Sequence, residues 1–285
     1  DGGAVDWPAR REAALLALVD AASLNLSKLF GMRTPDEALL LHLLRAACAV
    51  LEQPTAMRGA SAAFKEALWR LVAIPAVAYG QEVAAASSVV GLLLAHEHLA
   101  TPLAELMAHL LEEHQAARLV GGLLHELASL SPAQMGGDSL GVKNVASFFV
   151  AVAARAPLML LANAELLHDV LGSESYTLRC GVLSAVGNLH VAASRMKPAP
   201  PAEVADAALG LVATVLTRVH DTAAFVRLRA LQTRASMVEA RALSATDLIR
   251  AAQLGLARAD DKNANVRRGA MQLFSALLEF NPFGA

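Results

Sequence analysis

The chain has 285 residues, of which 55% are hydrophobic but only 4% are aromatic, and its formal net charge is −2 at pH 7. A charge so close to zero argues against a protein that coats nucleic acid and against an acidic tail. Much of the hydrophobic share is alanine and leucine, which favours closely packed helices and argues against a β-rich fold.

Hydrophobic residues recur at three- and four-residue spacing through most of the chain, which is the period of an amphipathic helix. No stretch alternates with period two between hairpin turns, so we predict no sheet. Helices are expected near 8–30, 35–52, 60–78, 81–98, 102–113, 115–130, 142–155, 157–171, 175–195, 201–219, 222–242, 245–258 and 263–280. Pro75 interrupts a helical run, and it is expected to kink or break the helix near Ile74.

Capping signals mark several of the expected helix starts. Thr34 stands three residues before Glu37, so the hydroxyl can accept from the backbone and the glutamate can reach back, as in a capping box. Two further starts are marked in a similar way by Thr101-Pro102 and by Ser244-Ala-Thr-Asp247.

One cassette is written three times in the second half of the chain. The copies read SESYTLRCGVL (173–183), DTAAFVRLRAL (221–231) and DKNANVRRGAM (261–271). Their arginines, Arg179, Arg227 and Arg267, are 48 and 40 residues apart, which is the period of HEAT-type helical hairpins. A single hairpin cannot bury its apolar face alone, so the cassettes predict an all-α HEAT-repeat solenoid of stacked antiparallel hairpins.

Turn-forming residues are concentrated at 131–141, and we place a soft boundary there. The predicted parts are an irregular, HEAT-like helical array at 1–135 and HEAT repeats with regular cassettes at 136–285, and they are expected to form one continuous solenoid. The chain starts at Asp1 without methionine and stops straight after a strong helix. We therefore expect it to be a fragment of a longer protein.

The cassette arginines are expected to link neighbouring repeats. In each copy a residue that can cap a helix, Ser173, Asp221 or Asp261, stands six positions before the arginine. The arginine is then placed to hydrogen-bond carboxylates or carbonyls of the neighbouring repeat. The predicted ladder consists of Arg179, Asp221, Arg227, Asp261 and Arg267.

The other basic residues near the cassettes are candidates for contacts with DNA phosphates. They are Arg229, Arg234, Lys262 and Arg268. Without a long basic run or aromatic residues on which bases could stack, we expect any contact with double-stranded DNA to be weak and sequence-independent.

The sequence carries no catalytic or metal-binding motif. There is no G-x-S-x-G nucleophile elbow and no phosphate-binding loop, so we predict no enzyme and no cofactor. His96 and His98 flank Glu97 at a spacing that places the two imidazoles on different helix faces, and His109 and His114 are also poorly spaced for one metal ion. No apolar stretch reaches the ~20 residues that a membrane span needs. The two cysteines form no CxxC pair, which indicates a reducing compartment, cytosol or nucleus.

The cassettes and several earlier segments resemble the condensin complex subunit 1 family, the HEAT-repeat non-SMC subunits of condensin I. The segments that carry the resemblance are LEQPT (51–55), AIPA (73–76), HEHL (96–99), KNVASF (143–148), SYTLRCGVLSAVGN (175–188), DTAAFVR (221–227), DKNANVRRGAMQLF (261–274) and NPF (281–283). They follow in consistent order from about residue 36 to residue 283.

This resemblance implies a scaffold that binds the kleisin subunit, meets an SMC ATPase head and touches DNA while condensin compacts mitotic chromosomes. It also implies a location in the nucleus and on chromosomes, with cytoplasm in interphase. ATP hydrolysis would belong to the SMC subunits, which agrees with the lack of catalytic motifs in this chain. The family's partner contacts follow no short motif that this sequence matches, so the resemblance assigns no binding residue.

Two other classes of function stay open from the sequence. One is a HEAT-repeat adaptor of another complex, of the transport-receptor or phosphatase-scaffold type, which co-purification with kleisin and SMC subunits would distinguish. The other is a helical enzyme, which would show a deep polar pocket with strongly shifted acids.

Overall fold

The computed structural model describes residues 7–24, 36–131, 134, 138–197 and 201–280. Throughout these ranges the secondary structure is helical, and no strand occurs. The structure divides into two compact units, residues 1–129 and 130–285. The predicted all-α helical-repeat class is confirmed. The boundary at 135/136 and the continuity of one solenoid stay predictions.

Unit 1 contains two layers of helices. Its helices are α1 (Trp7–Ser23), α3 (Glu37–Leu51), α4 (Pro54–Met57), α5 (Ala62–Ala73), α6 (Glu82–Ala95), α7 (Ala100–Glu112) and α8 (Ala117–Ala128), with a π-helix at Ile74–Ala78 and a 3-10 helix at Glu97–Leu99. α5 packs between α1 and α7 in one layer, and α6 packs between α3 and α8 in the other. The π-helix contains Pro75, which confirms the predicted irregularity near Ile74.

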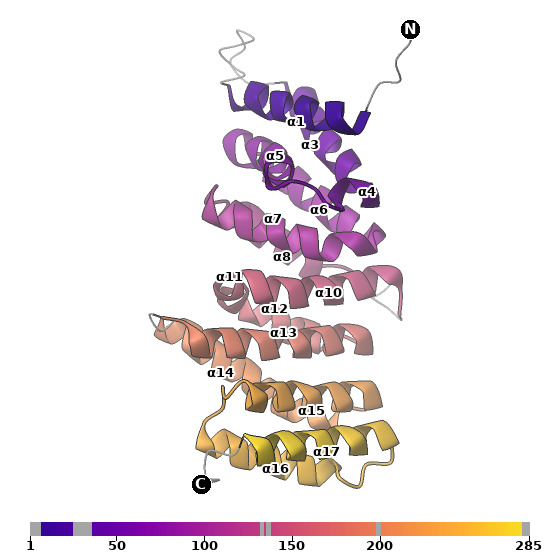
Figure 1. The fold of residues 1–285 in the computed structure, drawn as a ribbon, viewed down its shortest axis with the longest axis vertical. Coiled ribbons are helices and arrows are strands. Elements are labelled where there is room, and N and C mark those ends of the chain that lie inside the picture. The colour runs from indigo at the N-terminus through magenta and orange to yellow at the C-terminus, as the bar shows by residue number, and fades with distance from the viewer. Residues whose placement is uncertain (1–6, 25–35, 132–133, 135–137, 198–200, 281–285) are drawn as a thin grey trace. The chain divides into compact units, whose positions relative to one another are not determined.

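Unit 2 repeats the same plan. Its helices are α10 (Leu140–Arg155), α11 (Pro157–Ala162), α12 (Ala164–Leu171), α13 (Tyr176–Arg195), α14 (Ala202–Thr217), α15 (Ala224–Glu239), α16 (Ala245–Arg258) and α17 (Ala264–Glu279), with a 3-10 helix at Arg218–His220. α10, α13, α15 and α17 follow one another side by side (Figure 1). α14 packs against α11, α12 and α13, and α16 packs against α17. The single helix predicted at 157–171 is two helices in the structure, α11 and α12, which meet at Asn163.

The helix caps correct part of the sequence reasoning. The N-cap of α3 is Asp36, whose carboxylate accepts from the Ala38 N–H at 2.9 Å, whereas Thr34 lies outside the described residues. Thr101 lies inside the first turn of α7, because a 3-10 turn carries the helix start back to Ala100. Ser244 caps α16 as predicted and accepts from the Asp247 N–H at 3.2 Å.

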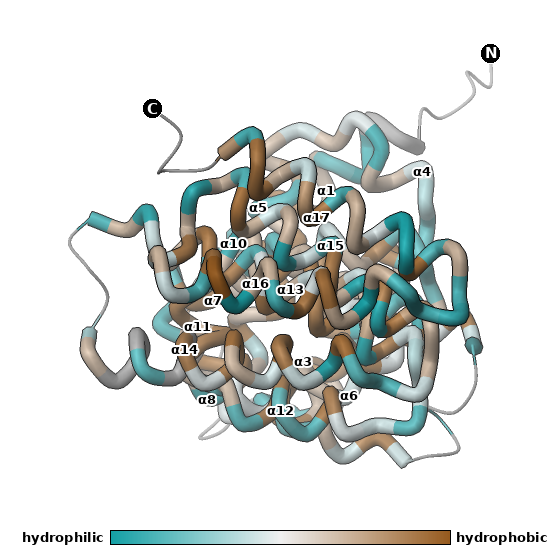
Figure 2. Tube along the Cα trace, turned by 90° about the horizontal axis from the view of Figure 1, so that it is seen from below, coloured by the Kyte–Doolittle hydropathy of each residue, from teal (hydrophilic) through white to brown (hydrophobic). Residues whose placement is uncertain are grey.

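Apolar side chains fill the interior of each unit. Hydrophobic and hydrophilic segments alternate along the helices in Figure 2, as expected for helices that bury one face. In unit 2 the largest hydrophobic side chains without exposed surface are those of Phe148 and Phe149 on α10, which lie with their rings 6.3 Å apart. These two side chains anchor α10 in the core, and other residues of α10 form one wall of the groove described below.

A glycine allows α13 to approach α10 closely. A Cβ atom at Gly181 would lie 2.6 Å from the Cβ and 2.8 Å from the Cα of Ala146, so one helix would have to move. We expect Gly181→Ala to lower the free energy of unfolding by about 1–3 kcal/mol, as overpacking does. Gly210→Ala on α14 is the control, because a Cβ atom there meets nothing within 4 Å. Replacing that helical glycine should stabilise by about 0.5–1 kcal/mol. Urea unfolding of both variants measures the two changes in the free energy of unfolding. Changes of the same sign would contradict the close approach of α13 to α10.

Candidate functional site

The three cassette arginines make the same contact with the loop that precedes their own helix. In each case Nη1 donates to the carbonyl six residues earlier and to the next carbonyl. The distances to the earlier oxygen are 2.7 Å for Arg179 to Ser173, 2.9 Å for Arg227 to Asp221 and 2.8 Å for Arg267 to Asp261. The guanidinium group is a charged donor for loop carbonyls that would otherwise have to bind water. This contact explains why each arginine follows the start of its cassette by six residues.

The residues at the start of each cassette are not the helix caps that the sequence reasoning took them to be. The N-cap positions are Ser175, Ala223 and Asn263, two residues further on. Asp221 and Asp261 instead each accept from the backbone N–H of that later position at 2.9 Å. This turn leaves the rest of each carboxylate available for side-chain donors.

Two arginine–aspartate pairs join successive cassettes. Arg179 Nη2 lies 3.0 Å from Asp221 Oδ1. Arg227 binds Asp261 with two hydrogen bonds, from Nε to Oδ2 and from Nη2 to Oδ1, both 2.9 Å long. The four side chains keep at most 10% of their surface exposed. The pairs thus connect the loop before α15 to α13 and the loop before α17 to α15.

Arg267 differs from the other two arginines. It is exposed, and among the described residues no carboxylate forms an ion pair with it. Its contact with the loop of its own cassette is nevertheless the same as theirs. The chain therefore contains a natural comparison between cassette arginines with and without an aspartate partner.

Two further arginines, which were not predicted from the sequence, lie at these aspartates. Arg218 lies 3.5 Å from Asp221, and Arg258 lies 3.2 Å from Asp261, in each case through Nη1 and Oδ2. The missed signal was an arginine three residues before each aspartate, a spacing that occurs at both positions. Each aspartate therefore binds two guanidinium groups.

The electrostatics of the pair formed by Arg227 and Asp261 follow from these contacts. The hydrogen bonds from Arg227 hold the pKa of the Asp261 carboxyl well below its usual range. Burial acts in the opposite direction, and the Asn263 N–H and Arg258 add to the lowering. The carboxylate is accordingly ionised throughout the physiological pH range.

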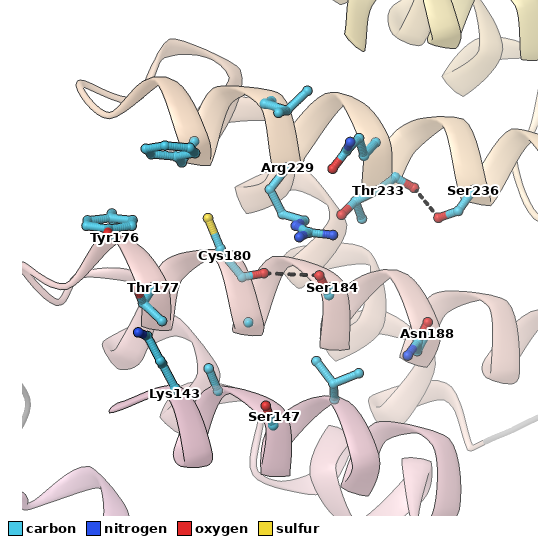
Figure 3. Close-up of a pocket in the computed structure, with 16 residues that line it drawn as sticks. Lys143, Ser147, Tyr176, Thr177, Cys180, Ser184, Asn188, Arg229, Thr233 and Ser236 are labelled. Atoms are coloured by element: carbon cyan, nitrogen blue, oxygen red, sulfur yellow. Dashed lines mark hydrogen bonds between the residues drawn. The ribbon is translucent and has the colours of Figure 1, made fainter. Parts of the chain in front are cut away.

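A groove of about 690 Å³ crosses α10, α13 and α15. Its walls are mostly small polar and apolar side chains. They are Lys143, Ala146, Ser147 and Val150 of α10, Tyr176, Thr177, Cys180, Gly181, Ser184 and Asn188 of α13, and Phe225, Leu228, Arg229, Gln232, Thr233 and Ser236 of α15. Figure 3 shows Arg229 extending from α15 toward α13, with Lys143 and Thr177 at one end and Asn188 at the other.

The polar groups of the groove are only partly used within the protein. Ser184 donates to the Cys180 carbonyl at 3.1 Å and Ser236 donates to the Thr233 carbonyl at 2.8 Å, as drawn in Figure 3. Lys143 forms an exposed ion pair with Asp138 at 3.1 Å. Burial raises the pKa of the Cys180 thiol, and Arg229 opposes this shift. The thiol is therefore neutral at physiological pH.

An aromatic pair lies beside Lys143 at one end of the groove. Tyr176 and Phe225 stack with ring centroids 5.6 Å apart and an angle of 24° between the rings. Phe225 is 62% exposed. This end of the groove offers apolar surface to a partner.

The four candidates for DNA contact differ in their burial and location. Arg234 is fully buried, so it cannot reach a phosphate, and that candidate was wrong. It lies seven residues after Arg227, on the same inward face of α15, a helical spacing that predicts its burial. Arg229 lies in the groove, whereas Lys262 and Arg268 are exposed at the start of α17.

The histidine pairs are closer than helical spacing predicted. α6 ends before His96, and the rings of His96 and His98 lie 5.7 Å apart. The rings of His109 and His114 lie 5.2 Å apart, because α7 ends between them. Within the described ranges, however, no three His, Cys, Asp or Glu side chains gather to hold a metal ion.

None of the helices in the described part of the chain is both long and apolar enough to cross a membrane. The fold and its contacts thus define a class: an all-α helical-repeat protein in which arginine–aspartate pairs connect hairpins and a polar groove crosses three helices. Proteins of this class have extended binding surfaces that are formed by stacked repeats.

Comparison with known proteins identifies the relatives of this chain. A family model described as "non-SMC mitotic condensation complex subunit 1, N-term" matches residues 2–85. Condensin complex subunit 1 of Mus musculus is 28% identical over 280 residues, which are 98% of this chain and 20% of that protein. Condensin-1 complex subunit CAP-D2 of Arabidopsis thaliana is 26% identical over 285 residues, again 98% of this chain and 20% of the relative.

A fungal relative agrees with these. Condensin complex subunit 1 of Saccharomyces cerevisiae is 26% identical over 272 residues, which are 95% of this chain and 23% of that protein. The resemblance to the condensin subunit 1 family is confirmed, and it extends nearer the N-terminus than residue 36. The chain spans about a fifth of the length of the curated relatives it matches.

Proposed function

We propose that this chain is part of a non-catalytic scaffold subunit of condensin that binds the kleisin and SMC subunits. The observation that carries the proposal is the similarity to condensin complex subunit 1 over 98% of the chain. The helical-repeat fold supports it, because such folds offer long surfaces to extended partners. A location on chromosomes and in the nucleus, with cytoplasm in interphase, belongs to the same proposal.

The groove is the surface of unit 2 that best suits a segment of the kleisin subunit. It is open along three neighbouring helices and offers hydroxyl, amide and guanidinium groups together with exposed aromatic surface. Such a mixture suits a peptide main chain and its side chains. A HEAT-repeat adaptor of a transport receptor or phosphatase complex would use the same kind of surface, so partner identity decides between the two.

Co-purification and crosslinking test this function. The full-length protein is expressed together with its kleisin and SMC subunits, and lysine-directed crosslinks are mapped in the purified complex. We expect all subunits to co-purify and kleisin residues to crosslink to Lys143, which lines the groove. Recovery of the protein without kleisin and SMC subunits would contradict the proposal and favour the adaptor alternative.

We propose that weak, sequence-independent contact with DNA is made by Lys262 and Arg268, which are both exposed. A net charge of −2 gives no long-range attraction to DNA. Log affinity should fall with log salt at a slope of about −0.9 per phosphate contact, equally for unrelated duplexes. Titration of two labelled duplexes at two salt concentrations measures this, and tight or sequence-selective binding would refute it.

A further inference from the structure

The charges of the groove all have one sign. Its sixteen lining residues include Lys143 and Arg229 but no aspartate or glutamate. Lys143 already has Asp138 as a partner at 3.1 Å. Across the described ranges no carboxylate forms an ion pair with Arg229. Arg229 has the neutral Cys180 thiol as its hydrogen-bond partner. It is therefore the guanidinium in this groove whose charge is available to an anion.

The second feature is the geometry of α15. Phe225, Arg229, Gln232 and Ser236 all line the groove, at positions separated by four, three and four residues. Residues at this spacing lie on one face of a helix. The row is about 16 Å long at 1.5 Å per residue. That length matches about five residues of extended peptide at about 3.3 Å each.

The chemistry along this row changes from one end to the other. Phe225 and Tyr176 present exposed aromatic surface, Arg229 presents a cation, and Gln232 and Asn188 present amides that can pair with a peptide backbone. One helical turn separates Phe225 from Arg229, which is about the distance between alternate side chains of an extended strand. A matching ligand has an apolar or aromatic residue two positions from an acidic one.

We propose that the groove of α10, α13 and α15 binds an extended acidic segment of a partner protein. An aspartate or glutamate of the segment pairs with Arg229, and an apolar or aromatic side chain packs on Phe225 and Tyr176. A single arginine suits a carboxylate, which it binds through two parallel hydrogen bonds, whereas phosphorylated motifs are bound by arginine clusters. Duplex DNA is not favoured, because its binding depends on several phosphate contacts.

The inference rests on the proposed scaffold function, from which it takes a protein segment as the occupant. Its test is independent of any condensin subunit. Random short peptides displayed on phage are selected on the purified chain, and selected peptides are synthesised with a fluorescent label. Their dissociation constants are measured by fluorescence polarisation for the wild type and the variants Arg229→Glu, Phe225→Ala and Arg195→Glu. Arg195 is the matched control, because it is an exposed arginine near the end of α13 that does not line the groove. Thermal melts establish that each variant is folded.

The selected peptides should be enriched in an acidic residue two positions from an apolar or aromatic one. Arg229→Glu should weaken their binding about tenfold to a hundredfold, the effect of losing a charged hydrogen-bonded contact. Arg195→Glu should leave it unchanged, and exchanging the peptide's acidic residue for lysine should restore binding to Arg229→Glu. Selection of peptides without acidic enrichment, or equal binding by Arg229→Glu and wild type, would overturn the inference. The inference would also be overturned if no peptide bound and a labelled short DNA duplex bound the wild type but not Arg229→Glu. Failure of the kleisin co-purification would leave this result standing, so the two proposals fail separately.

Discussion

Replacing Arg227 with alanine should lower the free energy of unfolding by about 3–5 kcal/mol, the usual cost of removing one partner from a buried ion pair. Arg227 is 5% exposed and makes two hydrogen bonds of 2.9 Å to Asp261. Without the guanidinium, a buried carboxylate loses its main donors, and the loop carbonyls of the same cassette lose theirs. Urea denaturation followed by circular dichroism measures the loss.

The third cassette supplies the matched control for this experiment. Arg267 makes the same contact with its own loop but has no carboxylate partner in the described part of the chain. Arg267→Ala should therefore cost about 1 kcal/mol, as expected for a hydrogen bond at an exposed site. The difference between the two variants isolates the contribution of the pair between cassettes. Equal losses would show that only the loop contact stabilises the fold.

Asp261→Asn should destabilise the protein by about 3 kcal/mol at neutral pH, because Arg227 and Arg258 then face an amide instead of a carboxylate. Arg227 holds the folded-state pKa of Asp261 well below its usual range, whereas an unfolded aspartate titrates near 3.9. The carboxylate's contribution is therefore complete above about pH 5 and is lost as the pH falls toward the folded-state pKa.

The stability difference between wild type and Asp261→Asn should consequently be constant from about pH 5 to pH 8 and shrink below about pH 4. Urea unfolding at a series of pH values measures it. The neighbouring Asp260 is exposed and provides the control, since Asp260→Asn should change stability by no more than about 0.5 kcal/mol. A difference that does not depend on pH would mean that the charge of Asp261 contributes nothing.

The helical class and the positions of the cassettes could be predicted because both are local properties of the chain. Apolar periodicity, Ser244 before Asp247, and the proline at 75 each act within one or two helical turns. The burial of Arg234 was predictable for the same reason, since it lies seven residues after Arg227 on one helix.

Tertiary packing decided the rest. The six-residue spacing before each arginine is a local loop contact, whereas the choice of Asp261 as the partner of Arg227 joins residues 34 positions apart.

The sequence by itself determined a stack of helical hairpins with arginines at a repeated position, because helix period and loop spacing are encoded within a few neighbouring residues. Only the tertiary structure decided which arginines find carboxylates, that Arg229 lines a groove, and that α10, α13 and α15 contribute jointly to that groove. These outcomes depend on distances between residues far apart in the chain, and such distances are fixed by the packing of whole helices.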